Sequence, residues 1–204
     1  VSDGQSVEPD KVIAYVEGNA RRLLAGERVA LNFLAHLSGI ATLTAQCVKQ
    51  VSACPHVKIM DTRKTTPGLR ELEKYAVKCG GGVNHRMGLY DQVLVKDNHK
   101  AAFKGKIEEI IKRIKKDKKG IKGIKKGIKI EIEVENLGEF KEALDAGPNI
   151  IMLDNMGIAN IKKAVTLKNI LYPVPCTLYP GLEVSGGVTL DNVRSIAATG
   201  VDMI

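Results

Sequence analysis

The sequence predicts an α/β protein whose parallel sheet forms part of an α/β barrel. After residue 53, short apolar segments alternate with helical segments at least five times, which is typical of a parallel sheet. Polar residues follow the apolar segments, as in barrels, where functional residues lie at the carboxyl ends of the strands. The chain has 204 residues, 44% hydrophobic and 26% charged, so it is long enough and apolar enough for one large core.

Composition argues against several classes of protein. No apolar run approaches the roughly 18 residues of a membrane span, and the N-terminus is too polar for a signal peptide. The four cysteines form no Cys-x-x-Cys pair, which argues against a zinc site or a disulfide framework. We therefore expect a cytoplasmic protein without a membrane partner.

The net charge of +8 comes from one stretch. Residues 112–129 hold ten basic residues and one acid, so the remainder is close to neutral. Ile107, Ile110, Ile111 and Ile114 predict an amphipathic helix over 101–116, with the lysines on its solvated face. Nucleic-acid binding is disfavoured, because no aromatic residue for base stacking lies between residues 103 and 140.

The remaining elements follow from hydrophobic periodicity and from breakers. The longest predicted helix runs from Glu27 to Val51, and a strand is expected over Val57–Met60. Further strands are expected over 92–95, 127–135, 149–155 and 181–189, and further helices over 69–78, 137–146, 158–167 and 190–199, the last with Thr189 as N-cap.

Cations follow two of the predicted strands. Arg63 and Lys64 come after Val57–Met60, and Lys96 comes after the apolar strand 92–95. Arg-Lys is also a common surface pair. However, a lysine next to a buried strand is costly unless it meets an anion, and the recurrence favours a site.

Carboxylates and a glycine turn follow other strands. Glu131, Glu133 and Glu135 alternate with apolar residues, so they share one face of a strand and would repel one another without a cation. Mg²⁺ prefers one or two carboxylates together with substrate phosphates, which fits Glu133 and Asp154. Ser185-Gly186-Gly187 would offer backbone N–H groups to a phosphate, although such turns also simply reverse a chain.

The same motifs carry a family likeness. The block Asp61-Thr-Arg-Lys-Thr-Thr-Pro-Gly-Leu-Arg70 closely resembles the quinolinate phosphoribosyltransferase family. The likeness runs over nearly the whole chain, in the order that the family has, and it weakens over residues 115–129 and 172–180. The segments that carry it are residues 27–32, 37–42, 80–82, 84–86, 96–99, 153–155 and 185–187.

This resemblance implies a fold and an activity. Residues 1–34 would be the C-terminal part of an N-terminal α/β sandwich domain with its connecting helix, and residues 35–204 an incomplete α/β barrel that continues beyond this chain. The family joins quinolinate to 5-phosphoribosyl 1-diphosphate, giving nicotinate mononucleotide, CO₂ and diphosphate for NAD synthesis. It works as a homodimer or a dimer-based hexamer.

The resemblance also implies residue roles. Quinolinate would be bound by Arg63, His85, Arg86 and Lys96, together with Arg28 of a second subunit. Thr62 belongs to the substrate-binding block, and Lys64 and Lys96 would contact 5-phosphoribosyl 1-diphosphate. Glu133 and Asp154 would hold its Mg²⁺ and, with Lys96, act in catalysis, while Ser185, Gly186 and Gly187 would bind the 5-phosphate.

Three alternatives remain at this point. One is a related phosphoribosyltransferase acting on another acidic ring, such as nicotinate. A second is a barrel aldolase that uses Lys96 as a Schiff base, which would require a desolvated lysine. The third is a nucleic-acid-binding protein that uses Lys112–Lys129.

Overall fold

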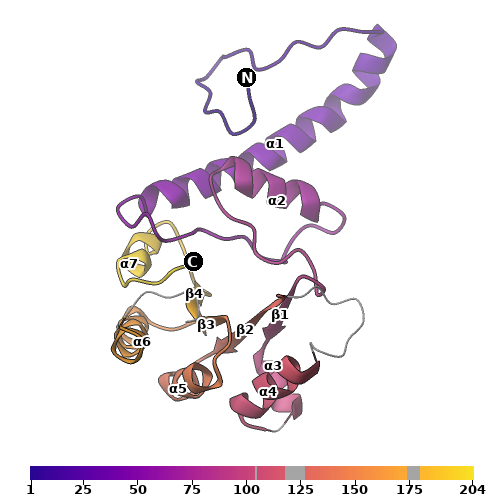
Figure 1. Cartoon of the computed structure of the whole chain (residues 1–204). Helices are drawn as coiled ribbons and strands as arrows, with labels where there is room; N and C mark the ends of the chain where they lie inside the picture. The colour runs from indigo at the N-terminus through magenta and orange to yellow at the C-terminus, as the bar shows by residue number, and fades with distance from the viewer. Residues whose placement is uncertain (104, 118–126, 174–179) are drawn as a thin grey trace. The chain divides into compact units, whose positions relative to one another are not determined.

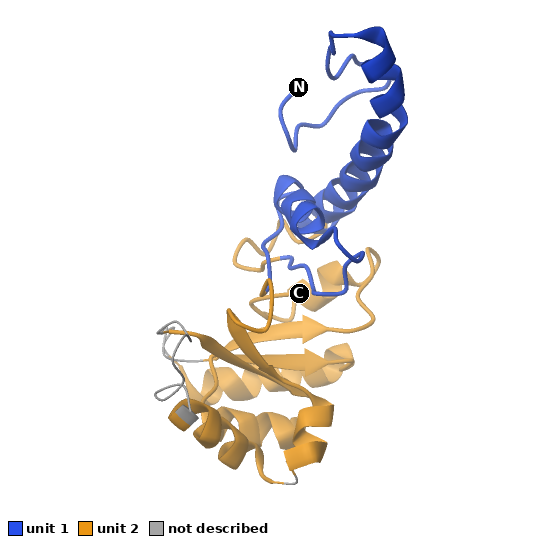
Figure 2. Ribbon diagram, turned by 90° about the vertical axis from the view of Figure 1, so that its right-hand side faces the viewer, with its two compact units in different colours: residues 1–49, 59–85 blue, residues 50–58, 86–204 orange. Residues whose placement is uncertain are grey.

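The chain divides into two compact units, one of residues 1–49 and 59–85 and the other of residues 50–58 and 86–204 (Figure 2). The computed structural model describes residues 1–103, 105–117, 127–173 and 180–204. Much of the basic stretch, residues 118–126, therefore lies outside the described residues.

The first unit is built on two helices, α1 (Ala20–Gln50) and α2 (Arg70–Cys79) (Figure 1). The predicted helix from Glu27 was too short, because α1 begins seven residues earlier. Gly80 ends α2 against α1: a Cβ there would lie 2.4 Å from the Ala41 carbonyl oxygen, so the close approach requires glycine. Residues 1–19 contain neither helix nor strand.

Within the described residues, α1 is also the helix that is long and apolar enough to cross a membrane. Core helices of other proteins meet the same criterion, so one such helix is weak evidence for a membrane protein. The expectation that the protein has no membrane partner stays a prediction.

The second unit contains a parallel sheet in the order β1-β2-β3-β4. Its strands are β1 (Gln92–Val95), β2 (Lys129–Val134), β3 (Ile150–Asp154) and β4 (Gly181–Ser185). The helices of this unit are α3 (Asp97–Phe103), α4 (Ile107–Asp117), α5 (Leu137–Ala146), α6 (Ile158–Leu171) and α7 (Val193–Ala197). Each strand lies beside its predecessor in the chain, which is the strand order of an α/β barrel and confirms the predicted α/β class.

Helices α4, α5 and α6 lie along one face of this sheet (Figures 1 and 2). Strand alternation puts Ile132 and Val134 on the opposite face of β2 from Glu131 and Glu133, and all four side chains are buried. Apolar and acidic side chains of one strand therefore occupy separate faces of the sheet.

Helix α5 shows how local sequence sets an element's ends. Asn136 accepts backbone hydrogen bonds from Gly138 and Glu139 at 3.0 and 2.9 Å, so it is the N-cap. Gly147 ends the helix in the left-handed region with φ of 62°. The predicted bounds of this helix are confirmed.

Several other predicted elements differ in extent from the structure; the helix expected over 158–167, for example, continues to Leu171 in α6. The helix expected over 101–116 is two helices, α3 and α4, with Gly105 between them. The helix expected over 190–199 is the shorter α7, and its N-cap is Asn192 rather than Thr189. The Thr189 carbonyl instead accepts hydrogen bonds from the N–H groups of Asn192 and Val193. The expected strand Val57–Met60 is reduced to isolated parallel bridges at Lys58 and Met60.

Candidate active site

The carboxyl edge of the sheet gathers the predicted site residues of the second unit except Arg86, which lies at the amino end of β1. Lys96 directly follows β1, Glu133 lies near the end of β2, and Asp154 and Ser185 end β3 and β4. The parallel register pairs Val95 with Ile132, which brings Lys96 level with Glu133. It also pairs Asp154 directly with Ser185, so residues distant in the chain share one edge.

Lys96 and Glu133 form an ion pair. Lys96 Nζ lies 3.2 Å from Glu133 Oε2, and the two side chains are 42% and 9% exposed. The lysine after the apolar strand therefore meets an anion, as its position predicted. Because the amine stays partly exposed while the carboxylate is buried, Lys96 is accessible to an anionic ligand.

The turn after β4 is built around Asn155 and Gly186. The Asn155 backbone N–H donates to the Ser185 carbonyl at 2.8 Å, and its amide donates to Asp154 Oδ2 at 2.8 Å. A Cβ on Gly186 would lie 2.1 Å from Asn155 Oδ1, and Gly186 and Gly187 both have positive φ, 89° and 64°. The Ser-Gly-Gly turn therefore requires glycine.

Asn155 is a member of this site that the sequence prediction missed. It has φ of 50°, a conformation that asparagine tolerates better than most residues, and it follows a strand directly. These two signals could have identified it. In contrast, α7 begins six residues after Gly187, so the expected helix N-terminus next to this turn is absent.

The face of the sheet that carries Glu133 also holds a buried pair of acids, Glu131 and Glu183. Burial, together with the charge of Glu131 and a hydrogen bond to it, raises the pKa of Glu183 to about 9. Glu183 therefore binds its proton more tightly than an exposed glutamate does. The Glu131 carboxylate also accepts a hydrogen bond from the Gln92 amide.

Glu133 and Asp154 fit a hard divalent cation by their chemistry. Both offer carboxylate oxygens, and they lie on adjacent strands β2 and β3. Glu133 pairs in register with Met152, two residues before Asp154, so both side chains leave the same face of the sheet. Glu135, in contrast, is exposed beyond the strand.

Arg86 is buried in the second unit, and its guanidinium donates to the Gln92 carbonyl at 3.2 Å. This bond ties the segment before β1 to the strand itself. Arg86 is therefore held at the start of the sheet by a contact that the sequence did not indicate.

The first unit holds Thr62, Arg63 and Lys64 in one loop. The Thr62 hydroxyl accepts from the Lys64 N–H at 3.0 Å. The Arg63 Nε is buried and has no hydrogen-bond partner among the described residues, which is unusual for a buried polar atom. Arg28 is exposed on α1.

Helix α2 holds this loop with polar side chains on one face. Arg70 donates to the Arg63 carbonyl at 3.2 Å, and Glu73 accepts from the Thr66 N–H at 3.1 Å. A Thr66 side-chain hydrogen bond is the main reason that the pKa of Glu73 is lowered, and His36 at 2.8 Å adds to it. Asp61, at the start of the loop, accepts from the His85 N–H at 2.9 Å.

The predicted residues thus fall into two sets. Arg63 and Asp154 belong to different units, and their shared part in one substrate site, which the family resemblance implies, stays a prediction. The division into domains at residues 34 and 35 also stays a prediction.

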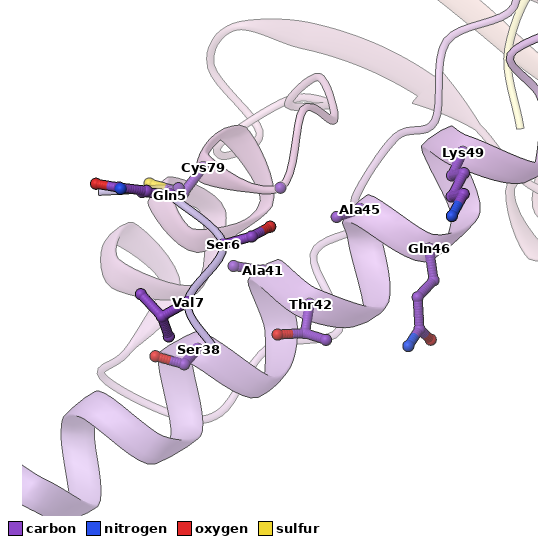
Figure 3. Close-up of a pocket in the computed structure, with 12 residues that line it drawn as sticks. Gln5, Ser6, Val7, Ser38, Ala41, Thr42, Ala45, Gln46, Lys49 and Cys79 are labelled. Atoms are coloured by element: carbon purple, nitrogen blue, oxygen red, sulfur yellow. The ribbon is translucent and has the colours of Figure 1, made fainter. Parts of the chain in front are cut away.

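A cavity of about 420 Å³ in the first unit lies apart from these residues (Figure 3). It is lined by residues 4–7, by a face of α1 that carries Ser38, Ala41, Thr42 and Ala45, and by Cys79. None of the predicted site residues lines it.

The basic stretch has a structural role where it is described. Lys115 Nζ donates to the carbonyls of Ala146 and Gly147 at 2.9 and 2.8 Å, where a cation stabilises the carboxyl end of α5. Arg113 lies 5.8 Å above the centre of the Phe103 ring. These contacts are typical of a helix such as α4, which packs on its neighbours by one face and is solvated on the other.

Comparisons with known proteins place the chain in a family. The family described as quinolinate phosphoribosyl transferase, C-terminal domain, matches residues 40–204, and the corresponding N-terminal domain matches residues 1–38. A probable nicotinate-nucleotide pyrophosphorylase [carboxylating] of Synechocystis sp. is 46% identical over 99% of this chain and 64% of its own length. One of Bacillus subtilis is 42% identical with the same coverage.

Solved structures agree with these matches. The crystal structure of NadC from Streptococcus pyogenes superposes with a TM-score of 0.86 at 38% identity, covering 100% of this chain and 66% of that one. A nicotinate-nucleotide pyrophosphorylase from Ehrlichia chaffeensis superposes with a TM-score of 0.76 at 48% identity, covering 89% and 60%. The chain spans 64% of the length of the first curated relatives it matches. It belongs to the quinolinate phosphoribosyltransferase family.

Proposed function

We propose that the protein transfers the phosphoribosyl group of 5-phosphoribosyl 1-diphosphate to quinolinate with decarboxylation, giving nicotinate mononucleotide, CO₂ and diphosphate. The observation that carries this proposal is the row of functional groups on one edge of the sheet. The Lys96–Glu133 pair, Asp154 and the Ser185-Gly186-Gly187 turn lie at the carboxyl ends of four adjacent parallel strands. Membership of a family described as quinolinate phosphoribosyl transferase supports this choice of substrates.

Recognition of quinolinate requires cations, because the substrate carries two carboxylates. An arginine pairs with a planar carboxylate through two parallel hydrogen bonds, so a dicarboxylate calls for several such donors. We assign this role to Arg63, His85, Arg86 and Lys96, with Arg28 contributed by a second subunit. The buried Arg63 Nε, which has no hydrogen-bond partner in the part of the chain that the structure describes, supports the assignment.

Recognition of the phosphoribosyl donor falls to the sheet edge and to the loop after Asp61. The Ser185-Gly186-Gly187 turn would bind the 5-phosphate through backbone N–H groups. Thr62, Lys64 and Lys96 would contact the substrates, and Glu133 and Asp154 would hold Mg²⁺. When bound, Mg²⁺ neutralises charge on the diphosphate leaving group.

The reaction then has two parts. The C–O bond to diphosphate breaks and the pyridine nitrogen forms a bond to the ribose carbon, while nearby carboxylates stabilise positive charge on the ribose. The C–C bond to one carboxylate breaks afterwards, CO₂ leaves, and the electron pair stays on the ring next to the positively charged nitrogen until a proton arrives. The protein has only to position the carboxylate.

The Lys96–Glu133 pair argues against the aldolase alternative. A Schiff-base lysine would be desolvated, whereas Lys96 is 42% exposed and its ammonium contacts Glu133. We further propose a cytoplasmic enzyme that works as a homodimer or a dimer-based hexamer.

Stoichiometry of CO₂ release tests the function. Purified full-length protein is supplied with 5-phosphoribosyl 1-diphosphate and carboxyl-labelled quinolinate, and we expect one CO₂ for each quinolinate consumed. Turnover of nicotinate without CO₂ release would instead identify a related phosphoribosyltransferase. Absence of turnover with both rings would refute the proposal.

A further inference from the structure

A buried ion pair in the first unit joins Lys74, on α2, to Asp61, at the start of the Thr62–Lys64 loop. The two side chains are only 2% and 8% exposed. Burying both charges costs free energy that apolar residues of similar volume would not cost, so stability alone is a poor reason for the pair. Its other hydrogen bonds point to a different purpose.

Both backbone groups of His85 are bound by this pair. Asp61 Oδ1 accepts from the His85 N–H at 2.9 Å, and Lys74 Nζ donates to the His85 carbonyl at 3.0 Å. One oxygen of Asp61 therefore receives hydrogen bonds from both Lys74 and His85. The carboxylate therefore binds the N–H of His85, and the ammonium binds the carbonyl of the same residue.

Asn84 completes the arrangement. Its amide donates to Asp61 Oδ2 and to the Lys74 carbonyl, the latter at 2.7 Å. The parallel bridge between Met60 and Val83 aligns the two segments just before they reach Asp61 and Asn84. The backbone around His85 is thus located by directional, charge-assisted bonds, which apolar packing would not provide.

We propose that Lys74 and Asp61 are positioning residues that set the place of the His85 side chain for quinolinate. This inference rests on the proposed function of the site. Lys74 acts through the backbone of His85, because its ammonium donates hydrogen bonds to Asp61 and to the His85 carbonyl. A shift of about 1 Å in such a residue can cost about 100-fold in rate.

The test is steady-state kinetics on the full-length protein with the variant Lys74→Met. We expect KM for quinolinate to rise about 10-fold or more, while KM for 5-phosphoribosyl 1-diphosphate stays within about 2-fold. In the background of His85→Ala, the same substitution should add little, because Lys74 works through His85. Lys168→Met is the control: it removes another lysine–aspartate pair, at 2.9 Å but more exposed (18% and 42%), and KM for quinolinate should not change.

A conservative variant covers the case in which Lys74→Met does not fold. Lys74→Arg keeps the charge, but its planar fork replaces the single nitrogen that reaches both Asp61 and the His85 carbonyl, so KM for quinolinate should rise to a smaller extent. An unchanged KM in Lys74→Arg would overturn the inference.

Two further results separate the inference from the proposed function. Multiplicative effects of Lys74→Met and His85→Ala, or an equal rise in both KM values, would overturn the inference while wild-type turnover stands. Lack of wild-type turnover would overturn the proposed function and the inference with it.

Discussion

Lys96 Nζ lies 3.2 Å from Glu133 Oε2, an ion pair that joins the ends of adjacent strands β1 and β2. The amine is partly exposed and the acid is buried. Removal of the amine leaves the buried carboxylate without this cation, and removal of the acid leaves the amine without its orienting partner. The two side chains therefore act as a unit, which leads to the first prediction.

Lys96→Met should lower kcat/KM about 100-fold or more, since a positioned cation at a developing charge contributes on that order. Glu133→Gln should have an effect of similar size, and the double variant should be far less impaired than the product of the two. Lys100→Met is the matched control. Lys100, on α3, forms an ion pair with Glu139, on α5, at 2.7 Å, and it has no proposed role in the reaction. Multiplicative losses would contradict the coupling of Lys96 with Glu133.

Gly186→Ala should impair the turn after β4. The left-handed backbone costs about 1–2 kcal/mol with a Cβ, and the new atom would overlap the Asn155 side chain. KM for 5-phosphoribosyl 1-diphosphate should rise about 10-fold, measured at saturating quinolinate.

Two glycine variants serve as comparisons for this prediction. Gly187→Ala has the positive φ without a clash, so its effect should be smaller. Gly157→Ala has an ordinary φ of −69° and open space, so its kinetics should match wild type. An unaffected Gly186→Ala would remove this turn from the phosphate site.

Stability should fall as the pH rises from about 5 to about 9. The pKa of Glu183 is raised to about 9 in the folded protein, above its ordinary value in the unfolded chain. The folded state therefore binds more protons over this interval, and its free energy of unfolding decreases as the pH increases. Urea unfolding at several pH values measures the slope.

Glu183→Gln isolates this contribution, because the amide stays neutral at every pH. Its free energy of unfolding should depend less on pH over the same interval than that of wild type. Glu142→Gln, an exposed change on α5, should keep the wild-type slope. Identical slopes in wild type and Glu183→Gln would show that this carboxyl does not bind its proton more tightly on folding.

Turnover should require a divalent cation. A chelator should abolish activity and added Mg²⁺ should restore it, because diphosphate is a poor leaving group without charge neutralisation. Asp154→Asn should raise the Mg²⁺ concentration for half-maximal rate about 10-fold, in line with the loss of a carboxylate ligand. An unaltered Mg²⁺ requirement would exclude Asp154 as a ligand.

Some predictions succeeded because they depend on local patterns. The bounds of α5 follow from Asn136 and Gly147, and both act within one helical turn. The shared face of Glu131 and Glu133 follows from the period of two in a strand. Other predictions failed where the local signal was ambiguous. The isoleucine stripe lies wholly within α4 and gave no sign of the break after α3. The short α7 follows a turn that is held by the hydrogen bonds of Asn192.

Local sequence patterns were enough to predict the α/β class, the separate apolar and acidic faces of β2, and the positions along the chain where cations and carboxylates end strands. Which of these groups contact one another could be seen only in the folded chain. Lys96 forms an ion pair with Glu133, 37 residues later in the chain. Lys74 binds Asp61 and His85 from α2, whose hydrophobic pattern shows only that the helix is amphipathic. The physical reason is that periodicity is a local property of the backbone, whereas a side chain's partner depends on strand register and helix packing, which the whole chain sets together.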